Sequence, residues 1–176
     1  MEKETMLKEV YDKAKGYELK NGNCAQCTIA AIFEIMGVED EGVFRAATGM
    51  ADGVGLTGDG HCGALSGGTM AISYFFGRSK DDFGRMGKQL KALILSKKLH
   101  DEFVAEFSTC RCADIQTKQS GRFFNLYDME EMKAALKAGM LEKCSTLVGK
   151  TARMALRIIL DEREAEKVKQ DELPVL

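Results

Sequence analysis

Six cysteines are the residues of this 176-residue chain that are best suited to chemistry. Cys24 follows an asparagine that can cap a helix, and Cys62 follows a glycine-rich stretch that leads into a predicted helix. Cys110 and Cys112 follow a serine–threonine pair, which can also cap a helix. The free amides and the dipole of a helix N-terminus favour a thiolate over a thiol. We therefore expect reactive or metal-binding thiols at these positions.

Cys144 has a different setting. It precedes Leu147, Val148 and Thr151 by three, four and seven residues, so it shares the inward face of their predicted helix. A buried helical cysteine on its own is most often a core residue. Together with the three helix N-terminal positions, however, Cys144 is a candidate for the fourth ligand of a common site.

Separated cysteines of this kind suit three chemistries: an iron–sulfur cluster, a structural zinc ion, or thiol–disulfide exchange. A structural zinc site normally uses two C-x₂₋₄-C motifs. This chain has one C-x-x-C, Cys24–Cys27, and one C-x-C, Cys110–Cys112. Thr28 stands where c-type haem attachment needs a histidine, so no haem is expected. The Cys24–Cys27 pair is a candidate redox dithiol. The remaining alternative is that the cysteines are buried structural thiols.

A glycine-rich stretch, GVGLTGDGHCGALSGG, runs over residues 53–68. It contains G-x-G-x-x-G, but a helix end rather than a strand precedes it and no G-K-[ST] follows, so no nucleotide is expected. Gly60 and Gly63 flank His61-Cys62, and we expect their amides to approach the Cys62 thiolate or cluster sulfides. His61 is either a second donor to the site or an exposed loop residue. The alternative for the glycines is that they only permit close helix packing.

Helical periodicity without sustained polar–apolar alternation predicts an all-α fold. We expect one domain over residues 1–176, a bundle of about six to seven helices with the glycine-rich loop before a central helix. Gly84 and Gly87 weaken the first turns of one of these helices. The predicted helices cover residues 3–20, 23–36, 39–47, 62–76, 79–107, 129–138 and 142–166.

Composition narrows the function classes. A formal net charge of −2 and a pI near 5.8 predict no nucleic acid and no anionic membrane as partner. No apolar run approaches the roughly 18–20 residues of a membrane span, and the charged N-terminus is unlike a secretory signal, so we expect a cytoplasmic protein. No Ser/His/Asp arrangement or paired carboxylates indicate a substrate-turnover site, although a role as an oxidoreductase component remains open.

Four stretches of the sequence resemble one family. They are Asn23-Cys24-Ala25-Gln26, the run CGALSGG from Cys62, the cysteine after Phe107-Ser108-Thr109, and Cys144 with Leu147-Val148. In this order they resemble the redox-active protein family named for its C-GCAxxG-C-C cysteine arrangement. The resemblance covers about residues 20–160, which is nearly the whole chain.

The resemblance implies a small helical protein of anaerobic metabolism. A related helical domain in split-Soret-type cytochromes has an assigned iron–sulfur cluster. By this resemblance, Cys24, Cys62, Cys112 and Cys144 would hold a 2Fe-2S or 4Fe-4S cluster for electron transfer or redox sensing, with Cys110 as the alternative to Cys112. Cys27 departs from the family pattern. The alternatives are a metal-free thiol–disulfide protein and a helical adaptor with structural zinc. The sequence does not identify the redox partner, and it leaves open whether the protein forms a homodimer.

Overall fold

The computed structural model describes residues 2–171, and every regular element within them is helical. The predicted all-α class is confirmed, with eight α-helices in the described part rather than six or seven. The elements are α1 (Lys3–Asn21), α2 (Cys24–Met36), α3 (Glu41–Ala46), the 3-10 turn η1 (Thr48–Met50), α4 (Gly63–Phe76), the 3-10 turn η2 (Met86–Gln89), α5 (Leu90–Phe107), α6 (Cys112–Ser120), α7 (Met129–Lys137) and α8 (Met140–Asp171).

One predicted helix boundary was wrong and the extent of one helix was missed, each for an identifiable reason. The helix predicted from residue 79 begins only at Leu90, because turns fill the segment containing Gly84 and Gly87. One such turn is closed by the Asp82 amide, which donates to Ser79 Oγ at 3.2 Å. The capping pair indicated a helix start near Cys112, but the extent of helix α6 was not predicted, since its nine residues are mostly polar and lack an apolar stripe. Its formation depends on contacts from distant residues, described below.

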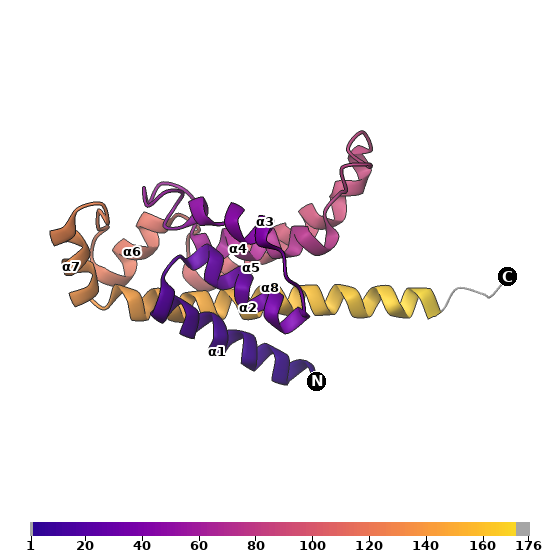
Figure 1. The fold of residues 1–176 in the computed structure, drawn as a ribbon, viewed down its shortest axis with the longest axis horizontal. Helices are drawn as coiled ribbons and strands as arrows, with labels where there is room; N and C mark the ends of the chain where they lie inside the picture. Colours follow the sequence, from indigo (N-terminus) through magenta and orange to yellow (C-terminus); the bar gives the residue numbers. More distant parts are fainter. Residues whose placement is uncertain (1, 172–176) are drawn as a thin grey trace.

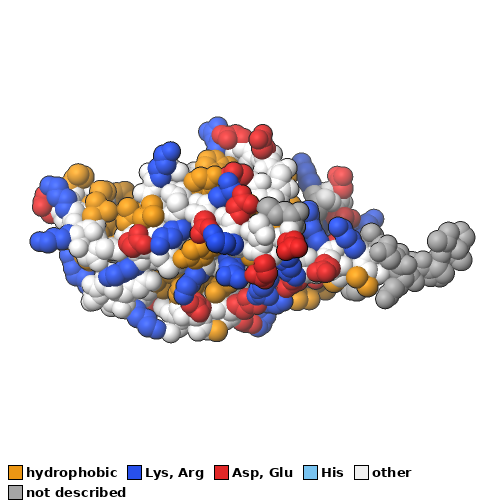
Figure 2. Space-filling model, turned by 90° about the horizontal axis from the view of Figure 1, so that it is seen from below, with side chains coloured by type: hydrophobic (Ala, Val, Ile, Leu, Met, Phe, Trp, Pro, Cys, Tyr) orange, Lys and Arg blue, Asp and Glu red, His pale blue; other side chains and the backbone are white. Residues whose placement is uncertain are grey.

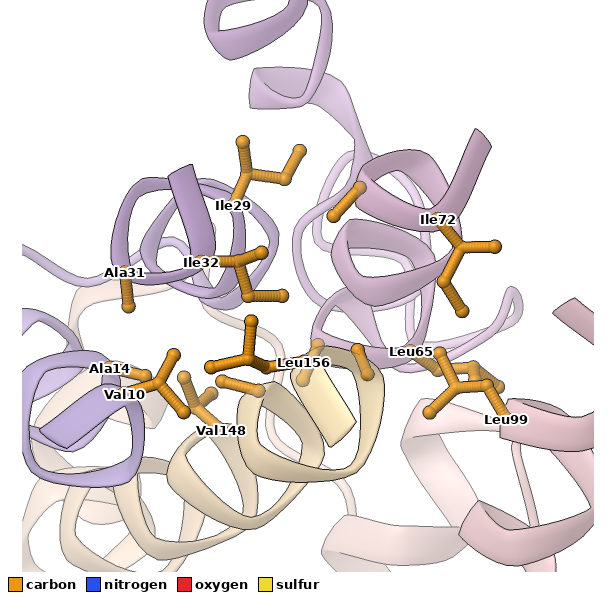
Figure 3. Close-up of a cluster of buried hydrophobic side chains, with 14 of the residues drawn as sticks. Val10, Ala14, Ile29, Ala31, Ile32, Leu65, Ile72, Leu99, Val148 and Leu156 are labelled. Atoms are coloured by element: carbon orange, nitrogen blue, oxygen red, sulfur yellow. The ribbon is translucent and has the colours of Figure 1, made fainter. Parts of the chain in front are cut away.

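The long helix α8 is the axis of the bundle, and α1 lies alongside it (Figure 1). Helices α2 and α4 pack against each other and against α8, while α5 covers the outer side of α4. Figure 3 shows how their buried aliphatic side chains meet between the helices. These side chains include Val10 and Ala14 of α1, Ile29 and Ile32 of α2, Leu65 and Ile72 of α4, Leu99 of α5, and Val148 and Leu156 of α8.

Acidic and basic side chains are intermixed over the face that Figure 2 shows. Some of them join α1 to α8, as in the ion pairs Lys3–Asp161 at 2.5 Å and Lys15–Glu142 at 2.7 Å. Exposed pairs of this type contribute little each, about 0–1 kcal/mol, so the apolar seam holds these helices together. Within residues 2–171, no helix is both long enough and apolar enough to cross a membrane.

The seam between α1 and α8 depends on a glycine. A Cβ at Gly149 of α8 would lie 2.9 Å from the ring and from the carbonyl oxygen of Tyr11 in α1, so only a glycine permits this approach. We expect Gly149→Ala to lower the free energy of unfolding by about 1–3 kcal/mol, measured by urea denaturation. The matched control is Gly16→Ala in α1, where a Cβ meets nothing within 4 Å. That variant should gain about 0.5–1 kcal/mol; equal stabilisation by both substitutions would contradict this packing.

Candidate functional site

Cys24 and Cys62 lie where the starts of α2 and α4 meet. Cys24 is the first residue of α2, whose N-cap Asn23 accepts a hydrogen bond from the Gln26 amide at 3.1 Å. Cys62 is the N-cap residue of α4, and its thiol lies close enough to that of Cys24 for Cys24 to be the largest cause of the raised pKa of Cys62. A Cβ at Gly63 would lie 2.3 Å from Cys24 Sγ, so the Cys24 sulfur occupies the space that a side chain at this position would fill.

The close approach of these two helices extends beyond their first residues. A Cβ at Gly67 of α4 would lie 2.5 Å from the carbonyl oxygen of Ala25 in α2. At Gly67, one turn into α4, the glycine therefore permits close helix packing, which was the alternative role expected for the glycines. Because the two backbones touch there, the helix starts that carry Cys24 and Cys62 are fixed relative to each other.

Cys112, the first residue of α6, joins this pair from a third side. Its buried thiol donates to Asp52 Oδ1 at 2.7 Å, and Gln116 Nε2 donates to the same oxygen at 2.5 Å. Cys112 is close enough to Cys24 and Cys62 for charges on these groups to interact. Cys144 of α8 lies within the same range of Cys24. The structure thus brings three of the four predicted cysteines, Cys62, Cys112 and Cys144, within interaction range of the fourth, Cys24.

The glycine-rich loop positions Cys112 through the main chain. The carbonyl oxygens of Gly60 and Gly58 accept hydrogen bonds from the amides of Cys112 and Ala113, at 3.0 and 2.9 Å. Two of the amides at the start of α6 thus find partners in a segment some fifty residues earlier, as a helix N-terminus requires. The Gly60 amide itself donates to the carbonyl oxygen of Gly53 at 2.9 Å, within the loop. Gly60 therefore acts on Cys112 through its carbonyl oxygen.

The loop needs its unusual sequence because its backbone is left-handed at several successive positions. A Cβ at Gly53 would lie 2.6 Å from the carbonyl carbon of Gly58, and one at Gly58 would lie 2.5 Å from the ring of Phe123. The loop therefore folds tightly on itself and against the segment that follows α6. Positive φ angles occur at Asp52, Gly53, Val54, Gly55, Leu56 and Gly58.

A short antiparallel bridge links the loop to the segment before α6. His61 pairs with Arg111, and the Cys62 amide donates to the carbonyl oxygen of Cys110 at 2.8 Å. The side chains of His61 and Arg111 are both exposed, and the His61 ring lies 6.3 Å from that of His100. His61 is thus placed on the outer side of the bridge, whereas Cys62 is buried on its inner side.

The expectation that helix N-termini favour thiolates was wrong for Cys62 and Cys112. A hydrogen bond with Cys24, followed by burial, raises the pKa of the Cys62 thiol, although the Ala64 amide donates to its sulfur and opposes this. Burial and then Asp52 raise the pKa of Cys112. Burial first, and then the proximity of Cys24, also raises the pKa of Cys144. Desolvation and neighbouring acidic groups outweigh the helix dipole, so these three thiols are protonated at neutral pH.

Two buried carboxyl groups adjoin the cysteines, and the sequence analysis missed both. Glu18 of α1 is 6% exposed and Asp52 is 8% exposed, and each keeps one buried oxygen without a hydrogen-bond partner in the described part of the chain. Glu18 follows Val10 and Ala14 at successive spacings of four, which places it on the inward face of α1. This spacing in the sequence indicated that Glu18 would be buried, whereas no sequence pattern indicated the burial of Asp52.

Cys27 turns away from Cys24. Its thiol donates to the carbonyl oxygen of Gly22 at 2.9 Å and lies near the Glu18 carboxyl group. Burial, with Glu18 as the next cause, raises the pKa of Cys27. Cys24 thus lies beside Cys62, whereas Cys27 lies beside Glu18 of α1. Within residues 2–171, no three His, Cys, Asp or Glu side chains are arranged to hold a single metal ion.

A family model described as "Putative redox-active protein (C_GCAxxG_C_C)" matches residues 22–158, which include all six cysteines. The chain belongs to this family. The matched region runs from the residue before the N-cap of α2 into α8, so it includes every helix that carries a cysteine. No curated protein and no solved structure matches the chain. Membership in the C_GCAxxG_C_C family assigns a redox-active character to the protein.

The space beside Gly63 provides a direct test of the Cys24–Cys62 contact. We expect Gly63→Ala to displace Cys24 Sγ, because the new Cβ would be 2.3 Å from it. The helical circular-dichroism signal should persist, while alkylation of Cys24 by iodoacetamide in the native protein should change several-fold. The matched control is Gly49→Ala in η1, where a Cβ meets nothing within 4 Å. Identical alkylation of Cys24 in both variants would show that Gly63 does not shape the site.

The buried Glu18 predicts a pH-dependent stability. Burial, as the largest cause, raises the pKa of this carboxyl above its unfolded value, so ionisation at neutral pH destabilises the fold. Wild-type stability should therefore rise relative to that of Glu18→Gln as the pH falls from 7 towards about 4, below which both folded and unfolded chains are protonated. Urea denaturation across this range measures the effect, with exposed Glu39→Gln as the control. A constant difference between wild type and Glu18→Gln would refute it.

Proposed function

We propose that this member of the C_GCAxxG_C_C family is a thiol–disulfide redox protein whose redox pair is Cys24 and Cys62. The observation that carries the proposal is the proximity of these two thiols where the starts of α2 and α4 meet. Oxidation joins the two sulfurs in a disulfide and releases two protons and two electrons. The electron acceptor is a disulfide of a small molecule or a partner protein, which is thereby reduced to two thiols.

The surroundings of the pair support a reduced resting state. Cys62 is 6% exposed, and its thiol is held protonated by Cys24 and by burial. Oxidation removes this buried thiol–thiol contact and replaces it with a neutral covalent bond, so no charge has to be buried in the product. Cys24 stands at the N-terminus of α2, where the helix dipole stabilises it as a leaving thiolate during exchange. A protein with this resting state would work in a reducing compartment such as the cytoplasm.

Serine substitutions test the pair. After treatment with one equivalent of diamide, the wild-type protein should lose two of its six thiols, and reduction should restore them. Cys24→Ser and Cys62→Ser should each abolish the Cys24–Cys62 disulfide, whereas Cys27→Ser should retain it. Thiol titration and peptide mapping of the trapped disulfide supply the measurements. Formation of a Cys24–Cys27 disulfide in the wild type would contradict the assignment.

An iron–sulfur cluster is the second candidate, because the thiols of Cys62, Cys112 and Cys144 lie within interaction range of Cys24. The donor set suits such a group, since cysteine thiolates are the usual ligands of its iron. Cys24, Cys62, Cys112 and Cys144 would hold the cluster, which would supply one-electron transfer. The zinc alternative has less support, since zinc needs its ligands to converge on one ion.

Anaerobic purification separates the two candidates. The thiol–disulfide protein is colourless and free of iron, with six titratable thiols after unfolding in denaturant. The cluster protein is brown and contains iron and acid-labile sulfide in equal amounts. Retention of that iron in Cys27→Ser but not in Cys144→Ser would establish the four-cysteine site. Zinc without iron would instead support the structural-adaptor alternative.

A further inference from the structure

Cys110 lies directly across the antiparallel bridge from Cys62. The bridge pairs His61 with Arg111, so the next residues in register are Cys62 and Cys110. The Cys62 amide donates to the carbonyl oxygen of Cys110 at 2.8 Å, which fixes this register. Facing residues of an antiparallel pair have Cα atoms about 4.5–5.5 Å apart, depending on their hydrogen bonds. Disulfides span Cα separations of about 4.4–6.8 Å.

The two thiols also share one face of the bridge. Side chains alternate between faces along an extended strand, and His61 and Arg111 are both exposed on the outer face. Cys62 and Cys110 are therefore on the inner face, where Cys62 is buried and Cys110 is partly buried against the same core. The pair differs in access, because Cys62 is 6% exposed while Cys110 remains partly open to solvent.

We propose that Cys110 is the relay thiol through which Cys62, the buried member of the Cys24–Cys62 pair, exchanges electrons with dithiols and disulfides outside the protein. This inference rests on the proposed thiol–disulfide function. In the oxidised protein, the Cys110 thiolate attacks Cys62 Sγ, the Cys24–Cys62 bond breaks, and Cys24 leaves as a thiolate that takes up a proton. The product is a Cys62–Cys110 disulfide, and the protein's oxidation state is unchanged.

The second half of the relay takes place at the surface. A thiol of an external dithiol attacks Cys110 Sγ and releases Cys62 as a thiol after protonation. The second external thiol then resolves the mixed disulfide and leaves Cys110 reduced. The external dithiol becomes a disulfide, and the protein regains the two thiols of Cys24 and Cys62. Without Cys110, an external thiol would have to reach the buried Cys62 directly or attack the partly exposed sulfur of Cys24, which is packed against Gly63.

Two experiments test the relay. In Cys24→Ser, oxidation with one equivalent of diamide should give a Cys62–Cys110 disulfide by peptide mapping, because Cys110 faces Cys62 across the bridge. In Cys110→Ser, the Cys24–Cys62 disulfide should still form, but its reduction by dithiothreitol should slow at least about tenfold. Cys27→Ser, another cysteine-to-serine change outside this bridge, should be reduced at the wild-type rate.

The outcomes separate this proposal from the one on which it rests. If Cys110→Ser is reduced as fast as the wild type and Cys24→Ser pairs Cys62 with Cys112 instead, the relay is wrong while the Cys24–Cys62 couple stands. If no Cys24–Cys62 disulfide forms in wild type or in Cys110→Ser, the proposed function fails first. A Cys62–Cys110 disulfide in Cys24→Ser together with slow reduction in Cys110→Ser supports the relay.

Discussion

The site depends on the close approach of α2 and α4, which glycines at two positions permit. At Gly63 the missing side chain leaves room for the Cys24 sulfur, and at Gly67 it lets α4 touch the α2 backbone at Ala25. Since both helices begin at this contact, Cys24 and Cys62 meet without either helix bending. The buried aliphatic side chains farther along the helices hold this arrangement through a core shared with α1 and α8.

Burial without a neutralising cation governs the chemistry of the cysteine cluster. Four thiols and the carboxyl groups of Glu18 and Asp52 lie within interaction range of one another, and burial raises the pKa of most of them. The buried thiols are therefore held protonated, and the Cys112 thiol donates a hydrogen bond to Asp52. A disulfide between Cys24 and Cys62 removes two protons and two electrons together, so both sulfurs stay uncharged. An iron–sulfur cluster would instead replace the thiol protons with iron and leave a net negative charge to be stabilised.

The sequence predicted the features that depend on local patterns. The helix starts at Cys24 and Cys62 followed from capping residues and from the glycine-rich stretch, and the structure has helices beginning there. A capping pair indicated the start of helix α6, but its extent could not be predicted, because its first amides are satisfied by loop carbonyls some fifty residues away. The raised thiol pKa values were missed for the same reason: the buried partners Asp52 and Glu18 come from distant segments. Which cysteines contact each other also depends on tertiary packing, so the sequence alone left Cys27 and Cys110 open.

The most direct test of the account is a redox titration of the Cys24–Cys62 couple. The protein is equilibrated anaerobically in dithiothreitol buffers of graded potential, quenched with acid, and the Cys24–Cys62 disulfide is quantified by peptide mass spectrometry. The account predicts one two-electron transition in this disulfide, with a tenfold change in its ratio to the dithiol for about 30 mV. A one-electron transition of a visible chromophore, with Cys24 and Cys62 never joined at any potential, would contradict the account.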